Sequence, residues 1–263
     1  HARRSLRRRL CRRVCCACVC CALAAAGAVG GVGLRAALLA LGAPGDAAVR
    51  ASTASRVIAL TVDDAPSLQT GALLDALAAA GARATFFCLG SRAEAHPALM
   101  ARVVREGHEV GNHMWDDRPS AAMRPAAFAS HAQRAAEALA PYGPVAWFRP
   151  GSGAFRGWMR RTVGGLGLRP ALGSAYAFDA QLLSHPRLAG ELLAAQVSPG
   201  AVLVMHDARP GSAEVLAAVL GAVGRGGYRA VTLSQLEAEA GGLALGRRRR
   251  RGPRRGGPAT LAR

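Results

Sequence analysis

The residues of this chain best suited to chemistry begin with an acidic pair. Asp63 and Asp64 follow the apolar run "RVIALTV". Neighbouring side chains of a strand point to opposite sides, so one carboxylate can bind a metal ion while the other faces a substrate. Taken alone, the pair is more typical of an N-cap or an Asx turn ahead of Pro66.

A histidine and an aspartate provide further candidate metal ligands. His113 and Asp117 are four residues apart in "GNHMWDDRPS", so both side chains reach one ion if the segment turns helically. Alternatively, Asp116 or Asp117 caps the turn before Pro119 or pairs with Arg118. The spacing alone leaves both interpretations open.

Three more charged side chains stand directly after apolar runs. Arg149 follows "VAWF" and can orient an aspartate by pairing with it, and Asp179 follows "SAYAF". His206 follows "AVLVM", where a strand would deliver a general acid to a site. Each residue has an ordinary structural interpretation by itself, and it is their shared placement that indicates a site.

The elements that must position these residues alternate along the chain. Seven strands are predicted, namely "RVIALTV", "ATFFCLG", "HEVGNH", "VAWFRP", "RPALGSAY", "AVLVMHD" and "YRAVTL". The predicted helices lie at 68–81, 96–107, 124–143, 155–166, 187–197, 212–224 and 234–240. This alternation predicts an α/β fold, a barrel of parallel strands rather than an open sheet. Because the carboxyl ends of barrel strands meet at one mouth, we expect the polar clusters to lie together.

The formal net charge of +18 is unevenly distributed. Residues 1–13 contain seven arginines and residues 247–263 contain eight, with no acidic residue in either segment. The rest of the chain holds 19 basic and 16 acidic residues and is nearly neutral. Solvated basic ends are therefore the simpler interpretation, and no specific nucleic-acid partner is expected. Binding of nucleic acid or anionic lipid by these ends is the alternative.

A membrane-targeting segment is predicted near the N-terminus. Residues 14–34 are uncharged and follow a basic flank, as in a membrane anchor or a signal peptide. We expect a secreted or membrane-anchored protein with an extracytoplasmic domain, and organelle targeting is the alternative. The predicted divisions are a basic N-terminus with this segment (1–34), a linker (35–54), a folded domain (55–240) and an arginine-rich disordered tail (241–263).

Six motifs resemble, in order, those of the polysaccharide deacetylase family (NodB homology, carbohydrate esterase family 4), in particular a divergent, fungal-type chitin deacetylase-like branch. The motifs are "LTVDDAPS", "TFFCLG", "HEVGNHMWDD", "FRPGSG", "SAYAFDAQ" and "VLVMHD". The resemblance covers residues 55–238. It implies a distorted (β/α)7 barrel that uses a divalent metal ion to remove N-acetyl groups from N-acetylglucosamine-containing polysaccharides.

The resemblance also implies roles for the residues of the site. Asp63 is similar to the catalytic base, and Arg149 to the arginine that orients it. His206 is similar to the general acid that protonates the leaving amine, and Asp179 to the aspartate that tunes this acid. The 55–240 segment is thus expected to be a catalytic domain.

The metal ligands implied by the resemblance are Asp64, His113 and Asp117. Asp117 stands where most members of the family have a second histidine. A carboxylate can still bind Zn²⁺, but this donor set is harder and more anionic, which can favour Co, Mn or Fe over Zn. One divalent ion is therefore expected, with its identity open.

Two further residues are expected to contact substrate. The backbone N–H near Ser152 would help to hold the oxyanion, and Trp115 is a candidate for stacking on a sugar ring. Gly151 and Ser152 replace the usual proline and aromatic residue of the family motif, so the grip on the sugar differs. A catalytically inactive, glycan-binding member of the same fold is the main alternative.

Overall fold

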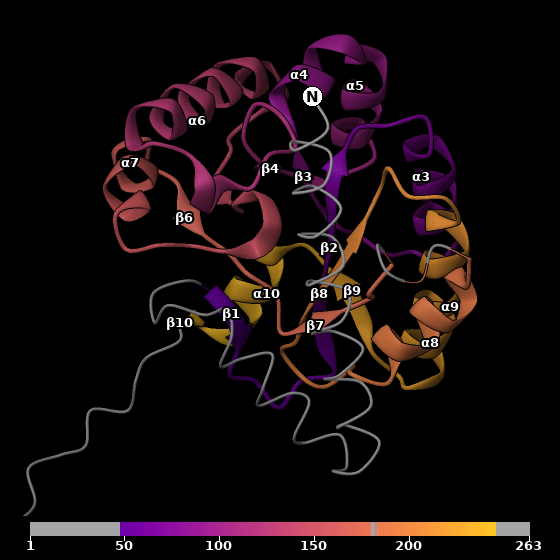
Figure 1. Ribbon diagram of the computed structural model, residues 1–263. Helices are drawn as coiled ribbons and strands as arrows, with labels where there is room; N and C mark the ends of the chain where they lie inside the picture. The colour runs from indigo at the N-terminus through magenta and orange to yellow at the C-terminus, as the bar shows by residue number, and fades with distance from the viewer. Residues whose placement is uncertain (1–47, 180–181, 183, 246–263) are drawn as a thin grey trace, which may run out of the picture.

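The computed structural model describes residues 48–179, 182 and 184–245. One large sheet, surrounded by helices, occupies the centre of the molecule, and a separate two-stranded sheet lies beside it (Figure 1). The strands of the large sheet are β2 (Val57–Ala65), β3 (Thr85–Cys88), β4 (Glu109–Asn112), β5 (Trp147–Phe148), β6 (Arg169–Pro170), β7 (Ala175–Tyr176), β8 (Val202–His206) and β9 (Arg229–Val231).

All strand pairs of the large sheet are parallel. The order is β6-β5-β4-β3-β2-β8-β7, with β9 pairing with the first residues of β2. This curled sheet confirms the predicted distorted (β/α)7 barrel. Within the described residues, no pairing closes the barrel between β6 and β7.

The opening of the barrel arises where one strand was predicted at residues 169–176. The structure has two short strands there, β6 and β7, at opposite edges of the sheet. Gly173 lies between them, and a Cβ atom at this position would be only 2.2 Å from Cγ2 of Val204. The chain can therefore pass from β6 to β7 only with glycine at this position. One continuous strand is excluded because β6 pairs with β5, whereas β7 pairs with β8.

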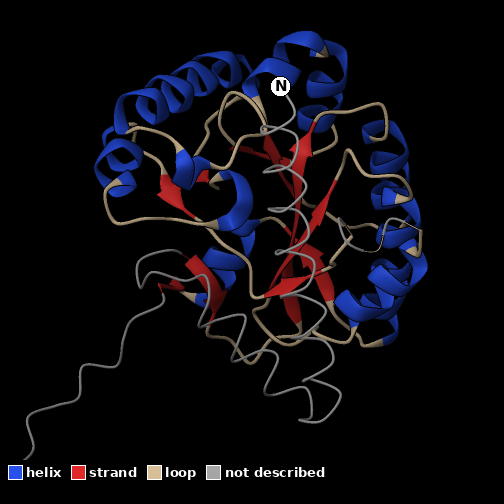
Figure 2. Cartoon of the chain, in the orientation of Figure 1, coloured by secondary structure: helices blue, strands red, loops and turns tan. Residues whose placement is uncertain are grey.

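Helices cover the outer face of the sheet (Figure 2). They are α3 (Thr70–Ala79), α4 (Gly90–Ala95), α5 (Pro97–Arg105), α6 (Pro125–Leu139), α7 (Met159–Gly165), α8 (Pro186–Ala194), α9 (Ser212–Arg225) and α10 (Leu233–Ala240). Seven match predicted helices within a few residues. Helix α4 was not predicted, because its six residues are too short for a clear apolar periodicity.

Strand β2 is a fully buried, internal strand of the large sheet. Every residue of β2 is buried, as expected for a parallel strand covered on both faces. Burying one large apolar side chain contributes about 1.5–3 kcal/mol, so this packing holds the sheet rigidly. The largest side chains in the core are Trp147, Phe86, Phe87, Phe128 and Phe148.

The second sheet extends the folded region beyond 55–240. Strand β1 (Ala48–Ala51) pairs antiparallel with β10 (Leu243–Leu245), so part of the predicted linker lies against part of the predicted tail. No helix in the described part of the chain is long and apolar enough to cross a membrane. The predicted signal or anchor at 14–34 and the arginine-rich ends lie outside the described residues.

The two ends of the barrel differ in chemistry. We call the end at which the parallel strands terminate the mouth and the opposite end the floor. At the floor, the Glu109 carboxylate accepts hydrogen bonds from the hydroxyl groups of Thr85 (2.7 Å) and Ser234. Thr85 Oγ1 also accepts the backbone N–H of Leu233 at 2.8 Å, and Trp147 Nε1 donates to Ser234 Oγ at 3.0 Å. This network fastens the first turn of α10 to the sheet.

Candidate active site

The acidic pair leaves the mouth end of β2 in two directions. Asp63 lies opposite Phe87 of β3 and His206 of β8. The register with β3 shifts directly after Asp63, and Asp64 has a φ of 64°, in the left-handed region. Both residues are buried, with 5% and 3% of their surface exposed. The two carboxylates therefore meet different partners, as the alternation of a strand predicts.

Asp63 forms a tightly held ion pair with Arg149. Arg149 Nη1 lies 2.6 Å from Asp63 Oδ1 and also donates to Thr61 Oγ1 at 2.7 Å. Arg149 Nε donates to the backbone carbonyl of Ala171 at 3.1 Å, and the guanidinium lies 4.0 Å from the centre of the Phe87 ring. Charge-assisted hydrogen bonds of this kind fix geometry, so Asp63 presents one carboxylate oxygen in a defined direction.

His206 is paired with Asp179 in the same mouth. The two Asp179 oxygens accept hydrogen bonds from His206 Nδ1 at 2.7 Å and from the His206 backbone N–H at 2.8 Å. Burial favours the neutral ring, but the hydrogen bond and charge of Asp179 outweigh it and raise the pKa of His206 to about 9. The imidazole is therefore protonated at neutral pH, and its Nε2–H is free of this pairing.

Asp64 and His113 form the third pair. Their nearest atoms, Oδ1 and Nε2, are 3.4 Å apart, and both side chains are about 5% exposed or less. His113 Nδ1 lies 2.8 Å from the backbone carbonyl of Arg149 and can donate to it. In the neutral ring this leaves a lone pair on Nε2, directed at Asp64, which is the arrangement of a metal-ligating histidine.

The charges around this pair keep Asp64 ionised. Burial raises the pKa of Asp64, but His113 and the neighbouring cations outweigh it and lower the pKa to about 2. Burial lowers the pKa of His113, whereas the Asp63 and Asp64 carboxylates raise it above its ordinary value. Two ligands of one tetrahedral zinc ion with bonds of ~2.1 Å are about 3.4 Å apart, so this pair is suitably spaced to hold a divalent ion.

Asp117 does not join this pair. The segment that follows β4 is not helical, and Met114 has a φ of 76°, so a spacing of four residues does not bring the side chains together. The Asp117 side chain is exposed, while Asp116 lies 3.0 Å from Arg118 and 3.4 Å from His131. The described residues contain no group of three His, Cys, Asp or Glu side chains able to hold a metal ion. The role of Asp117 as a ligand stays a prediction.

Ser152 lies at the rim of the mouth. It is exposed and has a φ of 65°, within a short 3-10 turn at Gly151–Gly153. The neighbouring N–H of Gly151 already donates to Ser120 Oγ at 2.8 Å. Whether the Ser152 N–H meets an oxyanion stays a prediction of the sequence.

The surroundings of Trp115 leave only part of its ring available to stack on a sugar. The Arg134 guanidinium lies 3.4 Å from the centre of its ring, so one face of the indole is covered. The ring edge also packs against Gly90, where a Cβ atom would be 2.8 Å from Trp115 Cε3. At most the opposite face of the half-buried ring can meet a sugar.

Sequence reasoning gave no role to Asp207, which anchors the loop after β2. This carboxylate is fully buried and accepts hydrogen bonds from Ser67 Oγ (2.9 Å) and Thr70 Oγ1 (2.5 Å). Burial raises its pKa, although both hydroxyl groups act in the opposite direction. The loop that follows the acidic pair is thereby fastened to the end of β8. Its position beside His206 was the only signal in the sequence.

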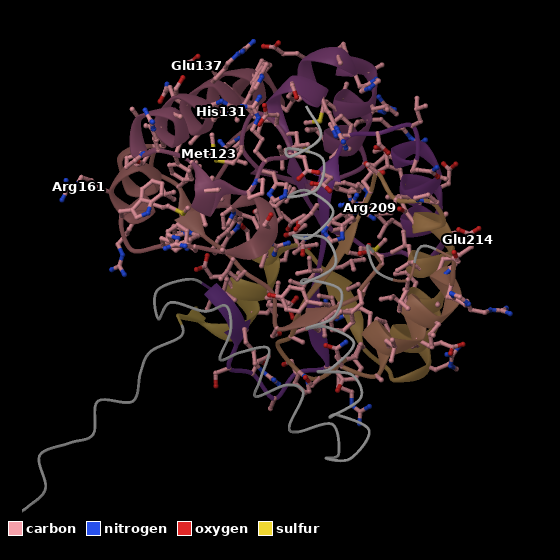
Figure 3. The ribbon with its side chains drawn as sticks, in the orientation of Figure 1. Met123, His131, Glu137, Arg161, Arg209 and Glu214 are labelled. Atoms are coloured by element: carbon pink, nitrogen blue, oxygen red, sulfur yellow. The ribbon has the colours of Figure 1, made fainter. Side chains whose placement is uncertain are left out.

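Arg209, which Figure 3 labels, was also missed, and it lies beside Asp64. Arg209 Nη2 is 3.4 Å from Asp64 Oδ2, and the arginine side chain is 33% exposed. The backbone N–H of Arg209 donates to Ser212 Oγ at 3.3 Å, which fixes the loop after β8. An arginine two residues beyond "HD" carries no recognisable signal in the sequence.

Comparisons with known proteins show which family the chain resembles. A family model described as "Polysaccharide deacetylase" matches residues 50–171. The chain is 32% identical over 166 residues to a chitooligosaccharide deacetylase of Rhizobium leguminosarum bv. trifolii, an alignment that covers 61% of this chain and 75% of that protein.

Two bacterial peptidoglycan deacetylases are similar as well. The chain is 29% identical over 186 residues to peptidoglycan-N-acetylglucosamine deacetylase PgdA of Listeria monocytogenes, covering 69% of this chain but only 39% of that protein. The solved structure of peptidoglycan deacetylase PdaC from Bacillus subtilis superposes with a TM-score of 0.65 at 26% identity, covering 70% of this chain and 91% of the other.

Proposed function

Since this chain belongs to the polysaccharide deacetylase family, we propose that it hydrolyses the N-acetyl groups of an N-acetylated glycan with a divalent metal ion. The observation that carries the proposal is the convergence of three pairs at one mouth, namely Asp63–Arg149, His206–Asp179 and Asp64–His113. They come from the ends of separate strands and supply a base, an acid and a cation site.

Asp63 is proposed as the general base. Its carboxylate is fixed by Arg149 and buried beside the cation site, so it can take a proton from an attacking water. Arg149 holds the carboxylate in one orientation, which keeps the reacting oxygen in place. Arg149 is thus a positioning residue rather than an acid or a base.

His206 is proposed as the general acid. Asp179 raises the pKa of His206 to about 9, against the effect of burial, so the ring carries a proton at neutral pH. It can give this proton to the nitrogen of the amide as the carbon–nitrogen bond breaks, which makes the amine a better leaving group. Asp63 and His206 lie opposite each other in β2 and β8, so they can act on the two sides of one amide.

Asp64 and His113 are proposed as the protein ligands of the ion, because their donor atoms converge at a suitable spacing. When bound, a divalent ion polarises the amide carbonyl and lowers the pKa of a water molecule. Carboxylate and imidazole donors suit zinc as well as cobalt, manganese or iron. Asp117 would be a third ligand only if the segment after β4 rearranged, because its side chain is exposed in the described conformation.

An N-acetylglucosamine polymer is the proposed substrate, because the relatives named above are deacetylases of chitooligosaccharides and peptidoglycan. These relatives are bacterial, and the fungal-type branch suggested by the motif remains a prediction. Peptidoglycan lies outside the cytoplasm, in keeping with the proposed secreted or membrane-anchored location.

The proposal is tested by acetate release from the metal-stripped full chain. Chitopentaose and soluble peptidoglycan fragments are supplied as substrates, and Zn²⁺, Co²⁺, Mn²⁺ or Fe²⁺ is restored in turn. Activity that returns with an ion and is lost in His113→Ala supports the proposal. Activity that is unaffected by metal removal contradicts it.

A glycan-binding protein without turnover is the second candidate, because only two metal donors converge in the described residues. Folded protein that binds chitopentaose but releases no acetate with any ion would establish this alternative. Equal glycan affinity in the wild type and Asp63→Asn would strengthen it, since a binding site has no need of a base.

A further inference from the structure

The carboxylate of Asp64 is shared between two neighbours in the structure. Oδ1 faces His113 Nε2 and Oδ2 faces Arg209 Nη2, each at 3.4 Å. The charges of Asp64 and Arg209 offset each other, as do those of Asp63 and Arg149. With His206 and Asp179 also paired, the mouth is close to neutral before any metal ion enters.

The two mouth arginines are held in very different ways. Arg149 makes hydrogen bonds of 2.6 Å to Asp63 and 2.7 Å to Thr61, and its side chain is 3% exposed. Arg209 reaches Asp64 only at 3.4 Å, its Nε is shielded from solvent without a hydrogen-bond partner, and its side chain is 33% exposed. Arg149 is therefore fixed by geometry, whereas Arg209 is held mainly by charge and has a route to solvent.

We propose that Arg209 is a built-in counter-cation of Asp64 that competes with the divalent metal ion for this carboxylate and lowers the affinity of the site. The inference rests on the metal site of the proposed function. A divalent ion between Asp64 and His113 is repelled by a guanidinium that contacts the same carboxylate, and this repulsion is weakly screened where the groups are buried. Metal binding then requires Arg209 to move outward, which its exposed portion permits.

The experiment measures metal affinity rather than activity. Metal-free full chain is titrated with Co²⁺, followed by visible absorption and by calorimetry, for the wild type, Arg209→Gln and Arg209→Lys. Arg209→Gln removes the charge, and we expect at least a tenfold tighter Kd. This tenfold change corresponds to about 1.4 kcal/mol. Arg209→Lys keeps the charge, so its Kd should stay within about threefold of the wild-type value.

Two controls separate this inference from the proposed function. Arg102→Gln removes a surface arginine that pairs with Asp75 and Glu106, and it should leave the Kd unchanged. His113→Ala should weaken binding in both the wild-type and the Arg209→Gln backgrounds. If His113→Ala has no effect, the metal site itself is wrong. If His113→Ala weakens Co²⁺ binding but Arg209→Gln does not tighten it, the metal site stands and only the competition by Arg209 is wrong.

Thermal unfolding distinguishes competition from a merely structural role. Without metal, Arg209→Gln leaves Asp64 with one partner fewer, so its Tm should fall below that of the wild type. With saturating Co²⁺, the difference should vanish or reverse, because the ion takes over the carboxylate. A Tm deficit that is the same with and without Co²⁺ would overturn the inference, as would a wild type and an Arg209→Gln variant that both fail to bind Co²⁺ at millimolar concentration.

Discussion

The pKa values of two histidines at opposite ends of the barrel are shifted in opposite directions. His108 at the floor has its pKa lowered to about 4, by burial and by the nearby Arg83. His206 at the mouth is also disfavoured as a cation by burial, yet the Asp179 carboxylate raises its pKa to about 9. Burial alone favours the neutral form of a histidine, so a charged partner decides the difference.

The difference shows what each end of the barrel is built to do. At the floor, His108 accepts the backbone N–H of Ala84, and Glu109 is bonded to two hydroxyl groups of the chain. At the mouth, Arg149 Nη2 and Arg209 Nε are shielded without hydrogen-bond partners. The floor groups named here are paired within the chain and stabilise the fold, whereas the two mouth nitrogens retain hydrogen-bonding capacity.

The largest effect should come from removing the proposed base. Asp63→Asn keeps a hydrogen-bond acceptor for Arg149 but cannot take a proton, so acetate release should fall by about 10²–10⁴-fold. The measurement is the initial rate with chitopentaose at saturating metal, with circular dichroism to verify folding. A folded variant that retains more than a tenth of the wild-type rate would remove Asp63 from the mechanism.

The floor histidine should make stability depend on pH. The folded chain keeps His108 neutral down to about pH 4, whereas the unfolded chain takes up this proton near its ordinary value of 6.5. The contribution of His108 is therefore fully present above pH 6.5 and is lost as the pH falls toward 4, by up to about 3 kcal/mol.

This effect is measured as urea unfolding from pH 4 to pH 8. His108→Gln retains an acceptor for the Ala84 N–H and does not titrate, so it serves as the matched control. The slope of stability against pH should be flatter in His108→Gln between pH 4 and pH 6.5. If stability depends on pH in the same way in the wild type and in His108→Gln, the folded chain does not keep the His108 ring neutral.

At the mouth, Asp179→Asn should lower the pKa of His206, because burial is then opposed only by the charges of Asp63 and Asp64. The fraction of protonated ring at pH 8 would fall, and activity with it, whereas the loss at pH 6 would be smaller. The His206 resonances in NMR spectra report the pKa directly. An unchanged pKa in Asp179→Asn would show that another group holds the proton.

The sequence predicted the barrel and most of the site because both depend on local patterns. Apolar runs that end in Asp63, His113, Arg149 and His206 mark strand ends, and strand ends of a parallel barrel share one mouth. Asp179 also follows an apolar run, but only the resemblance linked it to His206, because their distance in sequence hides the contact. The charged residues at the strand ends could therefore be predicted from the sequence.

The features that were missed depend on contacts distant in sequence or on single backbone angles. The pairing of β1 with β10 joins segments almost 200 residues apart and has no local signal. Met114 has a left-handed conformation and the segment that follows is not helical, so the four-residue spacing of His113 and Asp117 does not place both side chains on one helical face. Arg209 reaches Asp64 from a loop whose path is set by Ser212. Such loop geometry is not encoded in residue spacing.

A smaller effect is expected from the floor network. Glu109→Gln replaces one acceptor oxygen with a donor opposite the hydroxyl groups of Thr85 and Ser234, so about one hydrogen bond is lost. Stability should fall by about 1–2 kcal/mol in urea unfolding, with acetate release per folded molecule unchanged. A change in activity without a change in stability would mean that the two ends of the barrel are coupled.

The smallest expected effect tests the segment after β4. Asp117 is exposed and away from the Asp64–His113 pair, so in this conformation Asp117→Ala should change the Co²⁺ Kd by less than about threefold, whereas His113→Ala should weaken it by at least tenfold. Asp116→Ala is the matched neighbour, and it should act on stability through Arg118 and His131 instead. If Asp117→Ala weakens binding as strongly as His113→Ala, the segment must close over the ion. In that case the mouth, unlike the floor, would be completed only when its metal ion binds.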